Sequence, residues 1–274
     1  MSKHFSSWVN DVYTTLELEL LELLDFYHHQ PRKRIVHQMR LNLKKQLAFF
    51  QMIQLPPEIL GEHINVIRRF QKLLGKTRAI QVQEQKAKII EQALNTEDLI
   101  SKQFKDLEKT HTHNWRRYLK EESIALAMKS IREGLALSYQ HLPLEIFQQH
   151  LKEQMHHILF NIKALSNIVM FDAEKFHELR TNFKQLIYFS EWLQPIFHHL
   201  PFAPATIEEI RQIDRTIGEW HDYVALLKKV DKEEKEALAF AIKEQIEVHI
   251  LEARAQLSKV ESFLSPIEAY FSSS

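Results

Sequence analysis

The sequence predicts an all-α protein, and three observations support this prediction. Four glycines and eight prolines in 274 residues leave little room for the turns that connect strands. Long runs of the chain are rich in Leu, Glu, Lys, Gln and Ala, which are strong helix formers. No segment shows the alternation of apolar and polar residues that marks a half-buried strand. The hydrophobic content of 45% is ample for a sizeable core.

Prolines, glycines and capping signals divide the chain into predicted helices. Pro57 suits a first helical position, and Thr206–Glu209 and Asp231–Glu234 resemble capping boxes. Gly75 and Gly218 stand where a helix could end in a left-handed residue. In order, the predicted helices cover residues 5–29, 32–53, 57–74, 76–94, 97–120, 122–140, 145–170, 173–199, 206–217, 219–229 and 232–264.

A short pattern occurs once in each half of the chain. His37, Arg40 and Lys44 reappear with the same spacing as His177, Arg180 and Lys184. Positions 0, 3 and 7 of a helix fall on one stripe, so each copy presents three basic groups in a row about 10 Å long. A row of this kind, with no acid inside it, is suited to a polyvalent anion.

The repeat extends beyond the stripe. Ile67–Gly75 aligns with Ile210–Gly218, and the alignment pairs a basic residue seven before each glycine and another three before it. The separation along the chain is nearly the same as that between the two stripes, and fixed-period similarity indicates a repeated structural unit. We therefore predict two tandem halves within residues 1–274, covering 1–141 and 144–274.

The basic stripes border apolar faces of the same helices. On each helix four large apolar residues share one face and are predicted to be core, with the His, Arg and Lys beside them. A site placed next to a packed face sits on a rigid element. These apolar sets are Met39, Leu43, Leu47 and Phe50 in the first copy, and Leu179, Phe183, Leu186 and Ile187 in the second.

The charge of the chain is distributed unevenly, although its formal net charge is zero. Residues 26–57 and 63–83 contain no Asp or Glu but eleven Lys and Arg, whereas acids cluster elsewhere, as at Glu121–Glu122. Local potential decides what a cleft attracts. Because the second half is less basic, we expect an anion site that is stronger on its first side.

Four motifs together resemble the conserved histidine α-helical domain family, CHAD, and they cover essentially the whole chain in the family's order. They are similar to the family patterns V-H-x-x-R-V-x-x-R-R-x-R, L-G-x-x-R-D, L-H-x-x-R-x-x-x-K-x-L-R-Y and L-G-x-x-x-D. In this chain they read Val36-His37-Gln-Met-Arg40-Leu-Asn-Leu-Lys44-Lys45, Leu74-Gly75-Lys-Thr-Arg78-Ala79, Phe176-His177-Glu-Leu-Arg180-Thr-Asn-Phe-Lys184-Gln-Leu-Ile-Tyr188 and Ile217-Gly218-Glu-Trp-His-Asp222.

The resemblance implies two antiparallel four-helix bundles related by pseudo-two-fold symmetry, with a basic surface between them. It also implies a non-catalytic domain that binds inorganic polyphosphate, for which phosphate or sulfate could act as a surrogate. Partners would be polyphosphate-processing enzymes or polyphosphate granules. The chain departs from the family pattern at Leu47, Ala79, Gln185 and Ile187, and each lost cation removes a phosphate contact, so we expect weaker binding than in a member with all of them.

Two functions remain open. The first is a polyphosphate-binding module, and the second is a helical protein-interaction adaptor whose anion site has decayed and whose basic face docks an acidic partner. The histidines could contact the ligand or only pack at the border of the core, and Asp222 fits a structural role at a helix end. The predicted anion-binding residues are His37, Arg40, Lys44, Lys45, Arg78, His177, Arg180 and Lys184, with an outer ring of Arg68, Lys72, Arg211 and Arg215.

Several other classes are disfavoured. The sixteen histidines include no His-x-x-x-His pair, so we expect no metal and no cofactor. There is no Gly-rich phosphate loop, no Gly-x-Ser-x-Gly and no cysteine, so we expect no enzyme. Aromatic residues at core spacing argue against a nucleic-acid groove. No apolar leader or membrane span is expected, and the absence of cysteine fits the cytoplasm.

Overall fold

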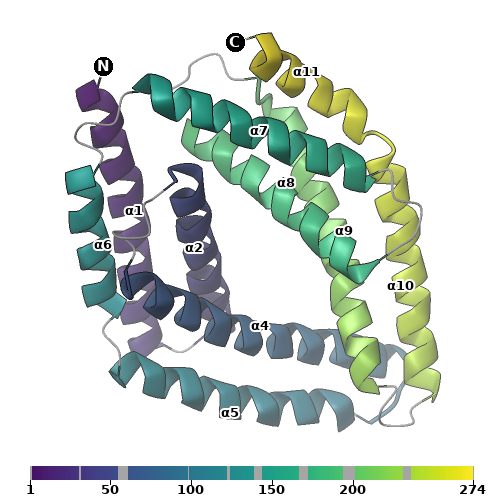
Figure 1. Cartoon of the computed structure of the whole chain (residues 1–274). Helices are drawn as coiled ribbons and strands as arrows, with labels where there is room; N and C mark the ends of the chain where they lie inside the picture. Colours follow the sequence, from purple (N-terminus) through teal and green to yellow (C-terminus); the bar gives the residue numbers. More distant parts are fainter. Residues whose placement is uncertain are drawn as a thin grey trace. The chain divides into compact units, whose positions relative to one another are not determined.

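The computed structural model describes residues 2–30, 32–54, 61–97, 99–121, 124–138, 144–166, 172–193, 201–230 and 236–273 (Figure 1). Within these ranges every regular element is a helix, which confirms the all-α prediction. The helices are α1 (Ser2–His29), α2 (Lys33–Met52), α4 (His63–Ala93), α5 (Leu99–Glu121), α6 (Ile124–Ser138), α7 (Leu144–Ser166), α8 (Ala173–Leu193), α9 (Pro204–Val230), α10 (Glu236–Leu257) and α11 (Val260–Ser273).

The chain divides into two compact units. Unit 1 comprises residues 1–84 and 101–149, and unit 2 comprises residues 85–100 and 150–274. Residues 85–100, at the end of α4 and the start of α5, thus cluster with the second half of the sequence. The boundaries of the two repeat halves and the arrangement as paired four-helix bundles stay predictions.

In unit 1, aromatic side chains from separate helices form the core. Phe5 and Trp8 of α1 contact Phe147 of α7, with ring centroids 4.5 and 5.8 Å apart. A second cluster centres on the buried Trp115 of α5, whose ring lies 4.6 Å from that of Tyr27. Aromatic pairs of this kind contribute beyond the area that they bury. The first cluster joins α1 to α7, and the second joins the end of α1 to α5.

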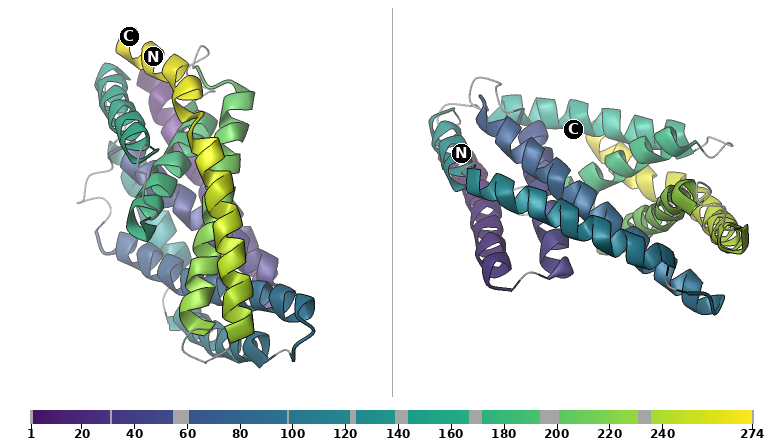
Figure 2. Two further views of the ribbon diagram at one scale, coloured as in Figure 1. Left: turned by 90° about the vertical axis from the view of Figure 1, so that its right-hand side faces the viewer. Right: turned by 90° about the horizontal axis from the view of Figure 1, so that it is seen from below.

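In unit 2, α8 packs on α9 and α10 runs along α9 (Figure 2). Phe176 at the start of α8 meets Trp220 in the middle of α9, with ring centroids 5.0 Å apart, and both residues are buried. The predicted apolar faces are confirmed in both units. Met39, Leu43, Phe50, Leu179, Phe183, Leu186 and Ile187 are buried, and Leu47 is half-buried.

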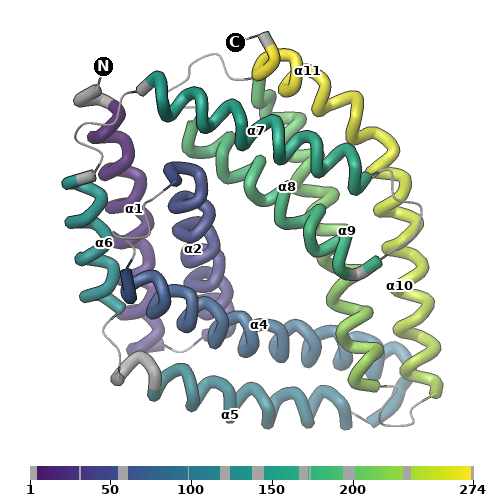
Figure 3. The backbone as a smooth tube through the Cα atoms, in the orientation of Figure 1, coloured from purple at the N-terminus to yellow at the C-terminus, as the bar shows by residue number. Residues whose placement is uncertain are grey.

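The predicted helix ends at the two glycines are wrong. Gly75 lies inside α4 and Gly218 inside α9, and each helix continues without a break (Figure 3). A glycine ends a helix when it adopts a positive φ. Among the described glycines that conformation belongs to Gly61, with a φ of 44°. Gly75 and Gly218 must therefore serve another purpose.

Four further expectations about helix boundaries have different outcomes. The predicted helix 232–264 is in fact two helices, α10 and α11, separated by Ser258 and Lys259. The predicted capping box at Thr206 is wrong, because α9 already begins at Pro204, where a proline lacks only an N–H that would have no helical partner. Pro57 and Asp231–Glu234 lie outside the described residues.

Candidate anion-binding site

The first stripe lies in unit 1, where α2 runs beside α4. His37, Arg40 and Lys44 follow one another along α2, and Arg78 belongs to α4; we call these four residues the His37 cluster. His37 is exposed, and the three cations are half-buried at the border of the core. Arg40, Lys44 and Arg78 all lie close enough to His37 to act on the charge of its imidazole.

The charges around His37 alter its protonation. Desolvation of the imidazole lowers the pKa of His37 below its usual value, and the positive charges of Arg78, Arg40 and Lys44 lower it further. Both effects disfavour the imidazolium form. Three cations close enough to act on one ring create a concentrated positive potential, and an approaching anion would reverse the effect on the histidine.

Gly75 gives Arg40 its place. A Cβ built at position 75 would lie 3.5 Å from Nε of Arg40, so the guanidinium crosses α4 directly over the glycine. A helical glycine costs about 1 kcal/mol relative to alanine. The side chain of Arg40 lies close against α4, at a distance that would leave a Cβ at position 75 in ordinary contact with it.

The second stripe lies in unit 2 and has the same packing. Arg180 of α8 crosses Gly218 of α9, where a Cβ would lie 2.9 Å from Nη2 of the guanidinium. The two glycines that the repeat aligns therefore do the same thing: each accommodates the arginine of its own half. The contact requires the missing Cβ at Gly218, whereas at Gly75 a Cβ would make an ordinary contact.

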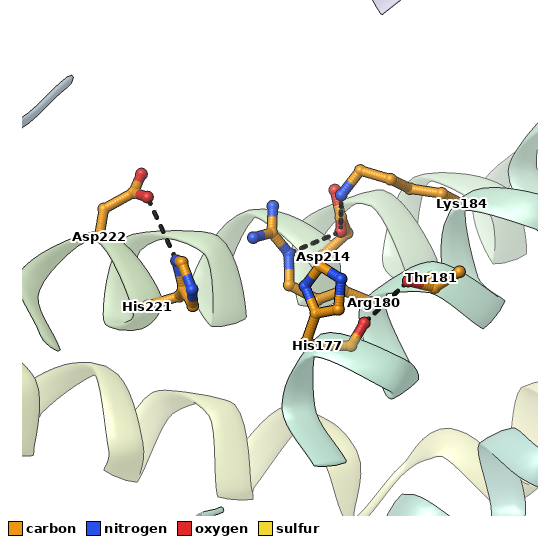
Figure 4. A network of polar contacts seen from close by, with 7 residues as sticks. All are labelled: His177, Arg180, Thr181, Lys184, Asp214, His221 and Asp222. Atoms are coloured by element: carbon orange, nitrogen blue, oxygen red, sulfur yellow. Dashed lines mark hydrogen bonds and ion pairs between the residues drawn. The ribbon is translucent and has the colours of Figure 1, made fainter. Parts of the chain in front are cut away.

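The expectation that no acid stands among the cations is wrong for the second stripe. Asp214 of α9 lies between Arg180 and Lys184 (Figure 4). Its Oδ1 accepts a hydrogen bond from Nε of Arg180 at 3.1 Å and another from Nζ of Lys184 at 2.5 Å. All three side chains are at most one-quarter exposed, so the ion pairs are partly shielded from water. The carboxylate thus supplies a counter-charge to both cations of the stripe.

The outer cations of unit 2 are also paired. Arg211 donates from Nη2 to Glu191 at 3.0 Å, and Arg215 donates from Nη2 to Glu208 at 2.8 Å. Arg215 and Glu208 are more than half exposed, so this pair contributes little to stability. The four predicted lysines and arginines of the second half thus all have carboxylate partners within their own unit.

The repeat shows that unit 1 lacks these three acids. When Gly75 is aligned with Gly218, Asp214 corresponds to Gln71 and Glu208 to Asn65. When His37 is aligned with His177, Glu191 corresponds to Gln51. In each case an uncharged amide stands where unit 2 has a carboxylate, and for Glu191 and Gln51 the two side chains have the same length. Ala79, which we noted as a departure from the family pattern, likewise stands opposite Asp222.

The remaining predicted residues lie on α2, α4 and α8, the helices that carry the stripes and their partners. Arg68 and Lys72 are exposed on α4, and Lys45 is half-buried on α2. His177 is exposed at the start of α8, and its carbonyl oxygen accepts a hydrogen bond from Thr181 Oγ1 at 2.9 Å (Figure 4). These residues belong to the same helices as the clusters, and their part in binding stays a prediction.

Asp222 does not stand at a helix end. It lies within α9, where its Oδ1 is 3.6 Å from Nδ1 of the neighbouring His221. Its expected role in bracing a helix end is therefore wrong, because α9 continues to Val230. The acid that matters for the cations, Asp214, was present in the aligned segment, but its partners lie on another helix and local spacing does not identify them.

Within the described ranges, no three His, Cys, Asp or Glu residues come together as a metal site would require. The same residues contain no helix that is both long enough and apolar enough to cross a bilayer.

Comparisons with known proteins agree with the motifs. A family model described as "CHAD domain" matches residues 26–230. The crystal structure of the CHAD domain from the plant Ricinus communis resembles the fold with a TM-score of 0.66 and 15% sequence identity, over 96% of this chain and 91% of that chain. At this identity the likeness concerns the fold. No curated protein matches the chain significantly.

The two glycines are expected to respond differently to alanine. Gly75→Ala should stabilise the protein by up to about 1 kcal/mol, because alanine favours the helix and its Cβ would make an ordinary contact with Arg40. Gly218→Ala adds the same helical preference but pushes the Arg180 guanidinium away from Asp214, so it should gain less or destabilise. Urea unfolding measures both variants, and equal stabilisation would show that Arg180 is not held in place.

Proposed function

The chain belongs to the CHAD domain family, and we propose that it is a non-catalytic binding module for inorganic polyphosphate. The observation that carries the proposal is the His37 cluster. Its three cations lie close enough to one imidazole to lower the pKa of that group, and the surrounding helical segments contain no acid between residues 63 and 83 or anywhere in α2. Such a surface favours a ligand with many regularly spaced negative charges.

The chemistry of the cluster fits phosphoryl oxygens. Arg40 and Arg78 each offer a planar fork that can donate two hydrogen bonds to one phosphate, and Lys44 offers a compact point charge. Because Arg40 rests on Gly75, part of its conformational freedom is already lost before the ligand arrives. His37 adds a donor that becomes positive as the ligand binds. A linear polyanion could contact all four in sequence along α2 and α4.

The asymmetry between the units points to unit 1 as the principal ligand site. In unit 2 an anion that contacts Arg180 and Lys184 must compete with the carboxylate of Asp214, which already accepts hydrogen bonds from both. Like charges brought together in a partly desolvated place repel strongly. In unit 1 the corresponding residue is the neutral Gln71.

The alternative is a helical adaptor that docks an acidic protein partner. The paired cations of unit 2 favour this alternative. Lys184 and Arg215 already have carboxylate partners, so they are less able to bind a further anion. A titration with long-chain polyphosphate separates the two functions. Association with polyphosphate-processing enzymes or granules and a cytoplasmic location belong to the proposal as expectations.

The first test removes the positive charge of the cluster. Arg40→Glu with Lys44→Glu should weaken the binding of long-chain polyphosphate by more than about tenfold, which corresponds to ~1.4 kcal/mol. Calorimetric titration at several salt concentrations measures the loss. Binding by the unaltered protein should also weaken as salt rises, through counterion release.

The matched control changes charge by the same amount elsewhere. Lys243 and Lys259 are exposed in unit 2, and Lys243→Glu with Lys259→Glu should leave affinity nearly unchanged. If the control weakens binding as much as the cluster variant, net charge alone is responsible. Tighter binding of duplex DNA than of polyphosphate would also contradict the assignment.

The second test exchanges the acid between the units. Asp214→Asn should raise polyphosphate affinity by roughly fivefold, because it frees Arg180 and Lys184 from an internal competitor. Gln71→Glu should lower the affinity by a similar factor by supplying that competitor in unit 1. Both changes alter the charge by one, and the ligand-induced rise in Tm offers a second readout. If neither substitution changes the affinity, the ligand binds elsewhere.

The third test follows the protonation of His37. In the free protein the lowered pKa keeps the imidazole neutral near pH 7, and a bound polyanion should raise the pKa. Binding should then take up a proton, and affinity should increase from about pH 8 towards about pH 6, by about tenfold for each pKa unit gained on binding. Calorimetry in buffers of different ionisation enthalpy detects the proton.

The stability of the free protein should respond to pH in the opposite sense. Because the pKa of His37 is lower in the folded than in the unfolded chain, its contribution to stability is complete above about pH 6.5 and is lost as the pH falls below that value. His37→Gln should flatten both pH dependences, whereas a variant that keeps both slopes would show that His37 does not contact the ligand. His177→Gln should have the smaller effect on binding, since the cations of its half are already paired.

A further inference from the structure

A pocket of about 500 Å³ lies in unit 1, next to the His37 cluster. Its volume falls in the range typical of small-molecule sites. The walls come from the end of α1, the start of α2, one residue of α4 and one face of α5, and none of the sequence motifs pointed to it. The lining includes Tyr27, Arg32, Lys33, Lys105, Glu108 and Arg116.

One face of α5 supplies most of the charge. Lys105, Lys109, Thr112 and Arg116 follow at intervals of four, three and four residues, which places them on a single stripe of the helix, and all four line the pocket. Arg32 adds a guanidinium from just before α2.

The acid in the lining is held by neighbours and does not oppose an anion freely. Glu108 accepts a hydrogen bond from Nε2 of Gln81 at 2.8 Å, and its other oxygen lies 3.2 Å from Nζ of Lys33. Lys33 also pairs with Glu84. Burial opposes the charged form of this lysine, but the hydrogen bonds to Glu84 and Glu108 outweigh it and raise the pKa of Lys33. Lys33, Gln81 and Glu108 thus hold one another where they line the pocket.

Arg116 is positioned before any ligand arrives. Its guanidinium lies 5.2 Å from the centroid of the Tyr27 ring, a cation–π contact. Tyr27 is itself buried against Trp115, so it forms a fixed platform for the arginine. Lys109 differs, because its partner Asp106 is exposed and their ion pair at 2.8 Å contributes little, so the lysine can turn to a ligand at small cost.

The pocket continues the His37 cluster along two helices. Lys33 lies one turn before His37 on α2, and Gln81 lies one turn after Arg78 on α4. A phosphate chain that followed the cluster towards the start of α2 would therefore reach the pocket. A terminal phosphate differs from an internal one in having a third free oxygen and a second ionisable proton, so it benefits most from a site with several convergent donors.

We propose that this pocket binds a terminal phosphate group, either at the end of a long polyphosphate chain or in a free short polyphosphate. Arg116 would form the principal fork, with Arg32, Lys105 and Lys109 around it. The inference rests on the proposed function for the long-chain source and is independent of it for the short anion.

The experiment uses the full chain and two matched variants of α5. The pocket variant is Lys105→Gln with Arg116→Gln. The control is Lys102→Gln with Arg117→Gln, which removes the same charge from exposed residues of the same helix that do not line the pocket. Tripolyphosphate titrated by calorimetry should bind the pocket variant about tenfold more weakly than the unaltered protein and bind the control nearly as well.

Two results would overturn the proposal: undiminished tripolyphosphate binding by the pocket variant, or equal losses in both variants. A second arm compares long-chain polyphosphate with free ends and with ends blocked as esters. If the blocked chain binds as tightly as the free chain and responds equally to the pocket variant, the pocket does not read chain ends. Loss of long-chain binding through Arg40 and Lys44 is measured separately, so failure of the pocket and failure of the proposed function give different results.

Discussion

In each unit the side chain of one arginine lies across a glycine in the middle of the neighbouring helix, and the candidate site depends on this contact. Arg40 over Gly75 and Arg180 over Gly218 place a guanidinium at the border between the core and the solvent. A charge held there is only partly hydrated, so it requires a counter-charge or a ligand more than an exposed arginine does. Each arginine belongs to a helix whose apolar face is buried in the core, so its backbone is held in place.

The two halves meet this requirement differently. Unit 2 supplies its own anion, Asp214, on the helix that carries the glycine. Unit 1 has the amide Gln71 at the corresponding position and concentrates cations around His37. Asp214 supplies a negative charge beside the arginine of unit 2, whereas the amide at the corresponding position of unit 1 supplies none. The net charge of zero conceals this difference, because it averages over both units.

Unit 1 also shows how basic groups from helices distant in sequence can act together. Lys33 and Gln81 line the same pocket as the α5 residue Arg116, and each lies one turn along its helix from a member of the His37 cluster. Glu108, which lies between them, is held by Gln81 and Lys33, and Lys33 also pairs with Glu84. Aromatic packing of Tyr27 on Trp115 connects this polar arrangement to the core of the unit.

The sequence by itself determined the helical class and the apolar faces of α2 and α8, because these follow from composition and from a period of 3.6 residues within one helix. The repeat and the family were visible in short motifs that recur in a fixed order along the chain. The sequence also located the basic stripes. Tertiary structure alone decided that Gly75 and Gly218 lie within helices, since the same residue serves as a helix end or as space for a neighbouring side chain. It also decided which cations are paired: Asp214 is 34 and 30 residues from Arg180 and Lys184. The pocket on α5 also depends on tertiary structure, because its lining comes from four helices. Ion pairs and cavities of this kind form where faces of separate helices meet, which residue spacing within one helix does not encode.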